Sequence, residues 1–389
     1  MSLPTLTLDK KLEPALASGH PWLYRNHLTG HHLETGDWVR VQAGKAQAVG
    51  LYDAESAIAV RFFSRDGVPE RSLIEARVKE ALTLREGLFA DGETNAYRLL
   101  FGEGDYLPGI TVDRYDRYAV LQTYARSLEV LVPEVVRSLA KGVNPSMPRM
   151  KLRGIVRRGE GGLEALWGQV PPPELTVTEN NLRLIANLHE GQKTGLFLDH
   201  RDNRLTLSRY CWGKTVLNLF SYSGAFSLYA VKGGAQEVTS VDIAPAATKD
   251  AKRNFELNGF DSSAHTFISA DVFKLLDDYV RGKRRFDVIV LDPPSLARDK
   301  ASRFAAMRAY RKLNSSAIRC ALPGGLLASA SCTSQVSPAD FKVILGEAAT
   351  EAGRRLQIFH EAGHAADHPV PANFPEGRYL KFVVGRVLD

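Results

Sequence analysis

The sequence has few cysteines and no long apolar run. Its three cysteines, Cys211, Cys320 and Cys332, are odd in number and far apart, which argues against a disulfide framework and against the paired spacing of a zinc site. We therefore expect no metal. The apolar stretches are strand-length and interrupted, and the first residues form no charged-then-apolar leader, so neither a membrane span nor a signal peptide is indicated. The expected location is cytoplasmic, with no membrane partner.

The sequence also lacks a Gly-x-Gly-x-x-Gly fingerprint. A dinucleotide pyrophosphate needs close backbone approach at several glycines, so an NAD-linked oxidoreductase is disfavoured. What is present is an ordinary globular composition of 389 residues, with 44% apolar and 24% charged residues. This length allows two to three domains.

The first two-fifths of the chain predict two small domains. Residues 1–70 read as short strands broken by turns, which favours a β-barrel-like module. Residues 71–172 begin with a predicted helix at 72–89 and continue in a β-β-α-β-β order, which favours a small α+β domain. The apolar face expected for that helix consists of Leu73, Ala76, Ala81, Leu84 and Leu88.

Three prolines at 171–173 predict a linker before the last domain, residues 173–389. This domain opens with a predicted hairpin around Asn180-Asn181. From about residue 190 strands and helices alternate, which is typical of a mostly parallel sheet covered by helices on both faces. The last two strands have only a loop between them, so we expect them to be antiparallel.

Acidic residues follow three predicted strands of this domain. Asp242, Asp271 and Asp292 each come at a strand end, and the carboxyl ends of such strands meet at one edge of the sheet. Asp242 lies eighteen residues beyond Gly224, where its carboxylate can accept both ribose hydroxyls, and Asp271 is placed to meet an adenine amine. A single Asp after a strand is as often a helix N-cap. Their recurrence favours a nucleoside cofactor without phosphates, S-adenosylmethionine.

Several of these segments resemble a known family. The stretches 218–226, 241–242, 270–273 and 292–294 resemble the motifs of class I S-adenosylmethionine-dependent methyltransferases. Further stretches, at 20–22, 98–113, 191–201, 366–370 and 375–377, are similar to those of the large-subunit (23S) rRNA cytosine-5 methyltransferases. That resemblance implies an amino-terminal PUA domain that binds RNA, a central β-β-α-β-β domain and a Rossmann-like α/β methyltransferase domain.

The resemblance also implies a cofactor site and two catalytic residues. The expected cofactor-binding residues are Phe197, Arg201, Asn218, Phe220, Ser221, Tyr222, Ser223, Gly224, Asp242, Ile243, Asp271, Val272, Asp292 and Pro294. Cytosine C5 is a poor nucleophile, so its methylation needs prior addition of a thiolate at C6, and Cys332 is the candidate. Asp292 would hydrogen-bond the edge of the base.

The sequence departs from this family at two positions. Many cytosine-5 RNA methyltransferases carry a second cysteine in the Asp-Pro-Pro loop, whereas Ser295 follows the prolines here, so removal of the C5 proton needs another base. The family commonly has glutamine where His200 stands. We interpret His200 as a tolerated substitution.

Basic residues are the candidate contacts to RNA. The net charge is +6, and two clusters contain the candidates Lys151, Arg153, Arg157, Arg158, Arg303, Arg308, Arg311 and Lys312. The expected partner is large-subunit rRNA or a ribosome assembly intermediate, and the sequence leaves open whether the chain forms a homodimer. The alternative for the cluster at 151–158 is structural packing between domains.

Two other functions stay open at this point. One is methylation of another rRNA atom, such as guanine N7, which needs no thiolate. Methylation of an exocyclic adenine amine fits less well, because an aromatic residue usually follows the two prolines in those enzymes. The other is an inactive RNA-binding or assembly protein, which would not bind S-adenosylmethionine.

Overall fold

The computed structural model describes residues 3–28, 32–142, 151–159, 161–297 and 301–389. The chain divides into two compact units. Unit 1 comprises Met1–Asn181, Ala186–Leu198 and Ala366–Gly377, and unit 2 comprises Leu182–Ile185, Asp199–Ala365 and Arg378–Asp389. Three segments that the sequence placed in the last domain, 173–181, 186–198 and 366–377, thus pack in unit 1. The domain boundaries at 70 and 172 stay predictions.

The amino-terminal part of unit 1 is a twisted sheet with the strand order β1-β3-β4-β5-β2. Its strands are β1 (Thr5–Thr7), β2 (Trp22–Tyr24), β3 (Trp38–Ala43), β4 (Ala46–Tyr52) and β5 (Ile58–Ser64), with helix α1 (Glu13–Ser18) beside them. The alternating residues Val39, Val41 and Ala43 of β3 are fully buried, which gives this sheet its own core. The sequence did not predict β2, because three residues are too short for a period to be visible.

A second sheet of unit 1 has the order β10-β9-β8-β7-β6. It is formed by β6 (Ala96–Phe101), β7 (Ile110–Tyr115), β8 (Tyr118–Thr123), β9 (Gly154–Gly159) and β10 (Gly162–Gly168), with helices α2 (Arg71–Leu88) and α3 (Val132–Gly142). The expected β-β-α-β-β order was incomplete, because β6 adds a strand before the first pair. A register shift between Arg98 and Leu100 breaks the alternation that would have revealed this strand.

The predicted apolar face of the first long helix was wrong. The residues of α2 that are buried are Ile74, Val78, Ala81, Leu82 and Arg85. Arg85 is fully buried, and its guanidinium donates to both carboxylate oxygens of Asp105, at 2.7 and 2.8 Å, and to the carbonyl of Asp367. The periodicity assigns only apolar residues to the core face, so it did not include Arg85, and the predicted face was rotated about the helix axis.

The chain first passes from unit 1 to unit 2 within the hairpin of β11 (Leu175–Glu179) and β12 (Leu182–Ala186). The predicted turn is confirmed: Asn180 and Asn181 have φ of 47° and 63°, the left-handed pair that a tight hairpin requires.

Unit 2 is built on a sheet with the order β15-β14-β13-β16-β17-β19-β18. The strands are β13 (Thr215–Leu219), β14 (Glu237–Asp242), β15 (Thr266–Ser269), β16 (Phe286–Leu291), β17 (Ala321–Ser331), β18 (Arg355–Ala362) and β19 (Lys381–Leu388). The strands from β15 to β17 are parallel, whereas β19 runs antiparallel to β17 and β18. The expected parallel sheet with an antiparallel final pair is confirmed.

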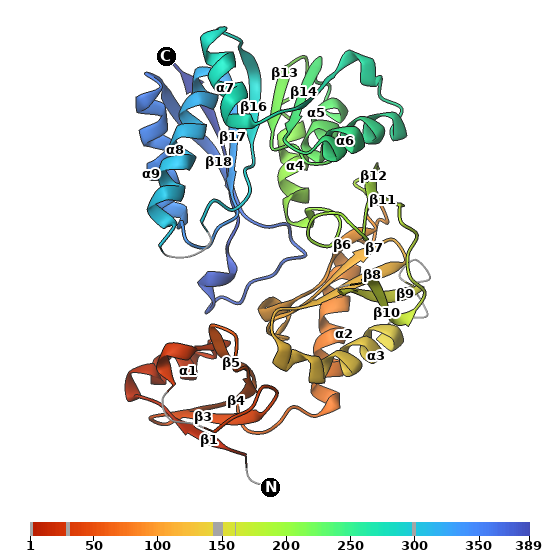
Figure 1. Ribbon diagram of the computed structural model, residues 1–389, viewed down its shortest axis with the longest axis vertical. Coiled ribbons are helices and arrows are strands. Elements are labelled where there is room, and N and C mark those ends of the chain that lie inside the picture. Colours follow the sequence, from red (N-terminus) through yellow and green to blue (C-terminus); the bar gives the residue numbers. More distant parts are fainter. Residues whose placement is uncertain (1–2, 29–31, 143–150, 160, 298–300) are drawn as a thin grey trace. The chain divides into compact units, whose positions relative to one another are not determined.

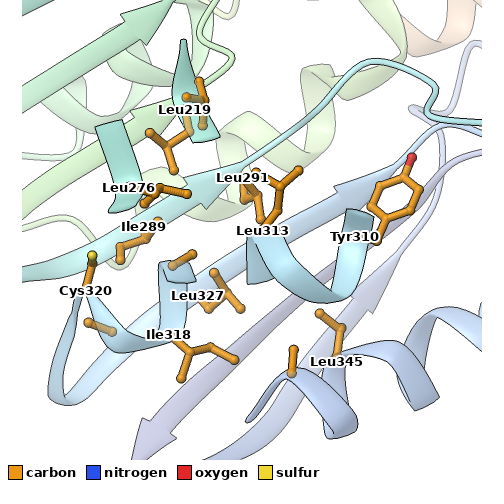
Figure 2. Close-up of a cluster of buried hydrophobic side chains, with 14 of the residues drawn as sticks. Leu219, Leu276, Ile289, Leu291, Tyr310, Leu313, Ile318, Cys320, Leu327 and Leu345 are labelled. Carbon is orange, nitrogen blue, oxygen red and sulfur yellow. The ribbon is translucent and has the colours of Figure 1, made fainter. Parts of the chain in front are cut away.

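Helices cover both faces of this sheet (Figure 1). They are α4 (Arg201–Ser208), α5 (Ala225–Lys232), α6 (Pro245–Leu257), α7 (Val272–Arg281), α8 (Arg303–Arg319) and α9 (Pro338–Glu351). Ile289 and Leu291 of β16 point into a core with α7, α8 and α9, part of which Figure 2 shows, whereas Val288 and Val290 point into a core with α4 and α5. The sheet is thus buried on both sides, as its apolar strands predict. Within the described ranges, no helix has the length and apolar character to span a membrane.

Candidate active site

The order of strands reverses at β13, which lies between β14 and β16. Parallel sheets bind ligands in the crevice at such a switch point, beyond the carboxyl ends of the strands. The register aligns these ends: Leu219 of β13 is opposite Val241 and Leu291, and Leu291 is opposite Ser329 of β17. The loops that follow β13, β14, β16 and β17 therefore leave from one edge of unit 2.

The loop after β13 has an unusual backbone. Phe220, Tyr222 and Gly224 have φ of 59°, 46° and 78°, and non-glycine residues are rare in this region. Asp242 holds the loop, because its carboxylate accepts from the backbone N–H of Tyr222 at 2.8 Å and of Ala244 at 3.0 Å. Such strain concentrates at ligand sites, where a fold fixes the backbone in a binding conformation.

Gly224 has a second, steric reason to be glycine. A Cβ on this residue would lie 2.8 Å from the Cβ of Ala251 in α6. The close approach of the loop to α6 therefore depends on the missing side chain, in addition to the positive φ.

Polar groups of this loop are left for a ligand. The hydroxyls of Ser221 and Ser223 are buried and have no hydrogen-bond partner among the described residues. Beside them, Ile243 follows Asp242 and is 69% exposed. Buried hydroxyls without partners are costly, and an exposed large apolar side chain at a strand end offers a surface for a planar ring. This set fits a nucleoside cofactor.

Three other predicted cofactor residues serve the fold in this conformation. Asn218 is buried and donates to the hydroxyl of Ser227 at 2.9 Å. Asp271 is the N-cap of α7 and accepts from the N–H of Lys274 at 3.1 Å, the alternative that the sequence had left open. Val272 packs in the core beneath the sheet. Their backbone atoms remain near the carboxyl ends of the strands, where the cofactor is expected to bind.

The remaining predicted cofactor-binding residues do not all lie in the same unit. Arg201 is buried, and its guanidinium is 3.2 Å from the carboxylate of Asp202. Pro294 is exposed at the Asp-Pro-Pro loop. Phe197 belongs to unit 1, where the ammonium of Lys193 lies 4.7 Å from the centre of its ring.

Asp292 and Cys332 are brought to the same region of unit 2. Each follows the end of a strand, β16 or β17, and both act electrostatically on the hydroxyl of Tyr310 in α8. Tyr310 lies at the end of the core cluster, and its hydroxyl points away from the apolar side chains (Figure 2). Burial raises the pKa of Tyr310 to about 12, so it remains a neutral hydroxyl at physiological pH. No sequence pattern pointed to Tyr310, because a tyrosine within a helix is usually a core residue.

The two loops that carry these residues are tied to one carbonyl. The oxygen of Ala297 accepts from the hydroxyl of Ser295 at 2.9 Å and from that of Thr333 at 3.3 Å. Thr333 directly follows Cys332, so this carbonyl connects the Asp-Pro-Pro-Ser loop to the loop after β17. Ser295 thus stabilises the loop that follows the two prolines.

His200 lies beside Asp292, which was not expected from the sequence. It is 3% exposed, and its Nε2 is 3.4 Å from Oδ1 of Asp292, although the contact is not aligned as a hydrogen bond. The amide nitrogen of Asn203 donates to the carbonyl of Gly363 at 3.0 Å and lies 3.1 Å from Nδ1 of His200. Because the carbonyl fixes the orientation of that amide, Nδ1 must accept, and the proton of neutral His200 is on Nε2, towards Asp292.

The predicted RNA-contacting residues of α8 differ in whether their charge is already held in an ion pair. Arg311 is paired with Glu347 and Glu351, at 3.5 and 3.4 Å, and Lys312 is 3.8 Å from Asp277. Arg303 is paired with Asp340 at 2.9 Å. Arg308 is exposed at the same helix.

The basic cluster of unit 1, at residues 151–158, also contains both paired and exposed side chains. Arg157 pairs with Glu129 and Glu164, and Arg158 donates to backbone carbonyls, among them that of Leu188 at 2.8 Å. The exposed members are Lys151 and Arg153.

Several motif residues of the resemblance are structural in unit 1. Asp113 accepts from Arg98 at 2.7 and 3.0 Å and from the hydroxyl of Thr194 at 2.6 Å, and that hydroxyl also contacts Tyr115. All four are part of one largely buried network. Among the described residues, no group of three or more histidine, cysteine or acidic side chains could hold a metal ion.

The reversal of strand order at β13, the strained loop after it and the acid at the end of β14 are typical of S-adenosylmethionine-dependent methyltransferases. A family model of that description matches residues 117–370, and a PUA-like domain model matches residues 6–65. The expected fold class, a PUA-like domain before a Rossmann-like methyltransferase sheet, is confirmed, as is the cofactor S-adenosylmethionine.

Full-length relatives narrow the family. The chain is 38% identical to ribosomal RNA large subunit methyltransferase I of Klebsiella pneumoniae, over 99% of this chain and 98% of that protein. It is 36% identical to the protein of the same name from Pseudoalteromonas translucida, over 96% and 97%. The chain thus belongs to the family of ribosomal RNA large subunit methyltransferase I.

Solved structures share the fold. The crystal structure of SMU.776 complexed with SAH is 25% identical and superposes with a TM-score of 0.87, over 98% of this chain and 100% of that one. A SAM-dependent methyltransferase from Streptococcus mutans superposes with the same score at 23% identity, over 99% and 100%, and shows the shared fold.

Proposed function

We propose that this protein methylates C5 of a cytosine in large-subunit rRNA, with Cys332 as the nucleophile and Asp292 as the partner of the base edge. The names of the relatives support large-subunit rRNA as the substrate. The observation that carries the choice of atom is the presence of a half-buried thiol, Cys332, in the same region as Asp292. Methylation of a purine nitrogen needs no such thiol.

Cys332 is suited to this role by comparison with the other thiols. Burial raises the pKa of Cys211 to about 12 and that of Cys320 to about 11, and both side chains are packed in the cores of unit 2. Neither can supply a thiolate near neutral pH or meet a base. Cys332 is partly exposed in a loop at the cofactor edge.

The reaction has two parts. The Cys332 thiolate forms a bond to C6, the C5–C6 double-bond pair moves to C5, and C5 takes the methyl group that S-adenosylmethionine supplies. A base, such as water, then removes the C5 proton, the double bond re-forms, and the thiolate leaves. A target within a duplex first has to be flipped out of the stack.

Asp292 acts on the other side of the base. One carboxylate oxygen faces Nε2 of His200, and we assign the other to the exocyclic amine or the protonated N3 of cytosine. A carboxylate there orients the ring and offsets the positive charge that N3 takes up as the thiolate adds. Tyr310 keeps its proton near neutral pH, because burial raises its pKa, so it adds no negative charge beside the two catalytic residues.

RNA contacts are assigned to exposed cations. Lys151 and Arg153 in unit 1 and Arg308 in unit 2 are exposed, whereas several of their predicted companions are held in ion pairs. We propose these three as phosphate contacts, and the PUA-like domain as a further RNA-binding module.

The test is to identify the modified atom. Purified protein and labelled S-adenosylmethionine are incubated with rRNA from cells that lack the enzyme, and the modified nucleotide is mapped. We expect 5-methylcytosine at one position. Label on a purine, or no transfer to rRNA by a protein that binds the cofactor, would contradict the proposal.

A further inference from the structure

A buried lysine lies next to the proposed nucleophile. Lys381 is the first residue of β19 and is 5% exposed. Its ammonium donates to the carbonyl of Thr333, and to that of Tyr379 at 2.8 Å. Two carbonyl dipoles offset part of the cost of burying an ammonium, and a neighbouring anion would offset more.

The position of Lys381 is set by strand pairing. In the antiparallel pair of β17 and β19, Lys381 is opposite Ser331, the last residue of β17. Its side chain then extends to the carbonyl of Thr333. Lys381 therefore contacts the chain on both sides of Cys332, and the two side chains interact electrostatically.

The electrostatics of the pair are mutual. Burial lowers the pKa of Lys381 to about 8, and Cys332 opposes this shift. An ammonium that is favoured by a nearby thiolate favours that thiolate in return.

Other titratable groups surround Cys332 from different elements. Tyr310 approaches from α8 as a neutral hydroxyl, because burial raises its pKa. Asp292, from the loop after β16, carries a carboxyl group whose negative charge would disfavour a thiolate, and Nε2 of His200 is 3.4 Å from its Oδ1. A thiolate in this setting needs a cation, and Lys381 supplies one.

We propose that Lys381 is a positioning residue whose ammonium stabilises the Cys332 thiolate and holds the loop that carries it. The thiol proton leaves to solvent, and the resulting thiolate–ammonium pair is ready to add to C6. The proposal rests on the proposed function, in which Cys332 is the nucleophile, but the thiolate–ammonium pair can be tested without RNA.

The test measures the thiolate directly. Alkylation of Cys332 by iodoacetamide is followed by peptide mass spectrometry from about pH 5 to about pH 10, because the thiolate is the reactive form. Buried Cys211 and Cys320 serve as internal references that should stay unmodified in the folded protein. We expect a wild-type midpoint below the value of about 8.5 for a free cysteine.

The variant Lys381→Met should raise that midpoint by about one pH unit or more, which is at least about tenfold slower alkylation at neutral pH. Lys381→Arg keeps the charge and should stay closer to the wild type. Binding of S-adenosylmethionine, measured by calorimetry, reports whether each variant is folded. An unchanged midpoint in folded Lys381→Met, or a wild-type midpoint at or above that of free cysteine, would overturn the proposal. The second criterion applies even if the variant does not fold.

Failure of the proposed function would be seen separately. If Cys332→Ala methylates rRNA at the wild-type rate while Lys381→Met shifts the midpoint, then the ion pair exists but Cys332 is not the nucleophile. If Cys332→Ala is inactive and Lys381→Met has the same alkylation midpoint as the wild type, then Cys332 is the nucleophile but Lys381 has no part in its activation.

Discussion

His200 offers the sharpest test of the geometry around Asp292, because its tautomer is fixed by its neighbours. Asn203 donates to Nδ1, so Nε2 carries a proton and faces the Asp292 carboxylate at 3.4 Å. A glutamine side chain can reproduce both interactions, since its carbonyl accepts from Asn203 and its amide donates to Asp292. These two contacts explain why glutamine, the residue that the family resemblance implies at this position, would fit here.

The perturbation is a pair of variants, His200→Gln and His200→Leu. Leucine keeps the apolar contact with Phe226 and Phe382, whose ring centres are 5.4 and 5.9 Å from that of His200, but removes both nitrogens. The contact between Nε2 and Asp292 is not aligned as a hydrogen bond in the structure, but one that forms on the way to the transition state would contribute about 1.5–3 kcal/mol, because its acceptor is charged. If the transition state uses it fully, kcat/KM should fall about 10- to 160-fold in His200→Leu. His200→Gln should stay within about threefold of the wild type.

The assay is methyl transfer to unmodified rRNA under kcat/KM conditions, with urea unfolding of each variant as the control for stability. His200→Leu should also lose some stability, because one amide proton of Asn203 is left without its acceptor. Equal damage by both substitutions, or full activity of His200→Leu, would refute the role assigned to His200.

Three further outcomes are expected. Ser221→Ala and Ser223→Ala should each leave the free energy of unfolding nearly unchanged, because their hydroxyls have no partner in the described part of the fold, but lower S-adenosylmethionine affinity about three- to tenfold by calorimetry; unchanged affinity would exclude them as ligands. Arg85→Met leaves a buried carboxylate without its guanidinium and should lower the free energy of unfolding by about 3–5 kcal/mol in urea, so a loss below about 1 kcal/mol would contradict the assigned pairing. Arg308→Ala should weaken RNA binding and reduce the slope of log affinity against log salt by about one, and a larger effect of Arg311→Ala, whose guanidinium is held by two glutamates, would contradict the assignment.

Much of the unit 2 fold could be predicted because its elements follow simple periods. Buried parallel strands such as Phe286–Leu291 are apolar runs between helices of ordinary length. In unit 1, the Asn180-Asn181 pair predicted a hairpin turn. Errors arose where one residue breaks a rule. The bulge beside Arg98 hid β6, and buried Arg85 displaced the predicted face of α2.

The candidate site was predictable at strand ends and much less so elsewhere. Asp242, Asp292 and Cys332 follow strands, so their convergence depends only on strand order. His200 and Lys381 are assigned roles because of tertiary contacts, which no local sequence pattern predicts. His200 precedes α4 and Lys381 begins an antiparallel strand. Both are far in sequence from the residues that they contact, Asp292 and the loop of Cys332. Their places follow from the tertiary fold.

The central claim is that Cys332 bonds covalently to the target base, and trapping that bond tests it most directly. In an rRNA fragment transcribed with 5-fluorocytidine, C5 carries fluorine, which cannot leave as a cation, so the enzyme should stall after methyl transfer. We predict a complex that survives denaturing electrophoresis, requires S-adenosylmethionine, and contains the Cys332 peptide, with Cys332→Ser forming none. A wild-type enzyme that methylates the unfluorinated fragment at cytosine but forms no adduct with the fluorinated one, or an adduct retained by Cys332→Ser, would contradict the account.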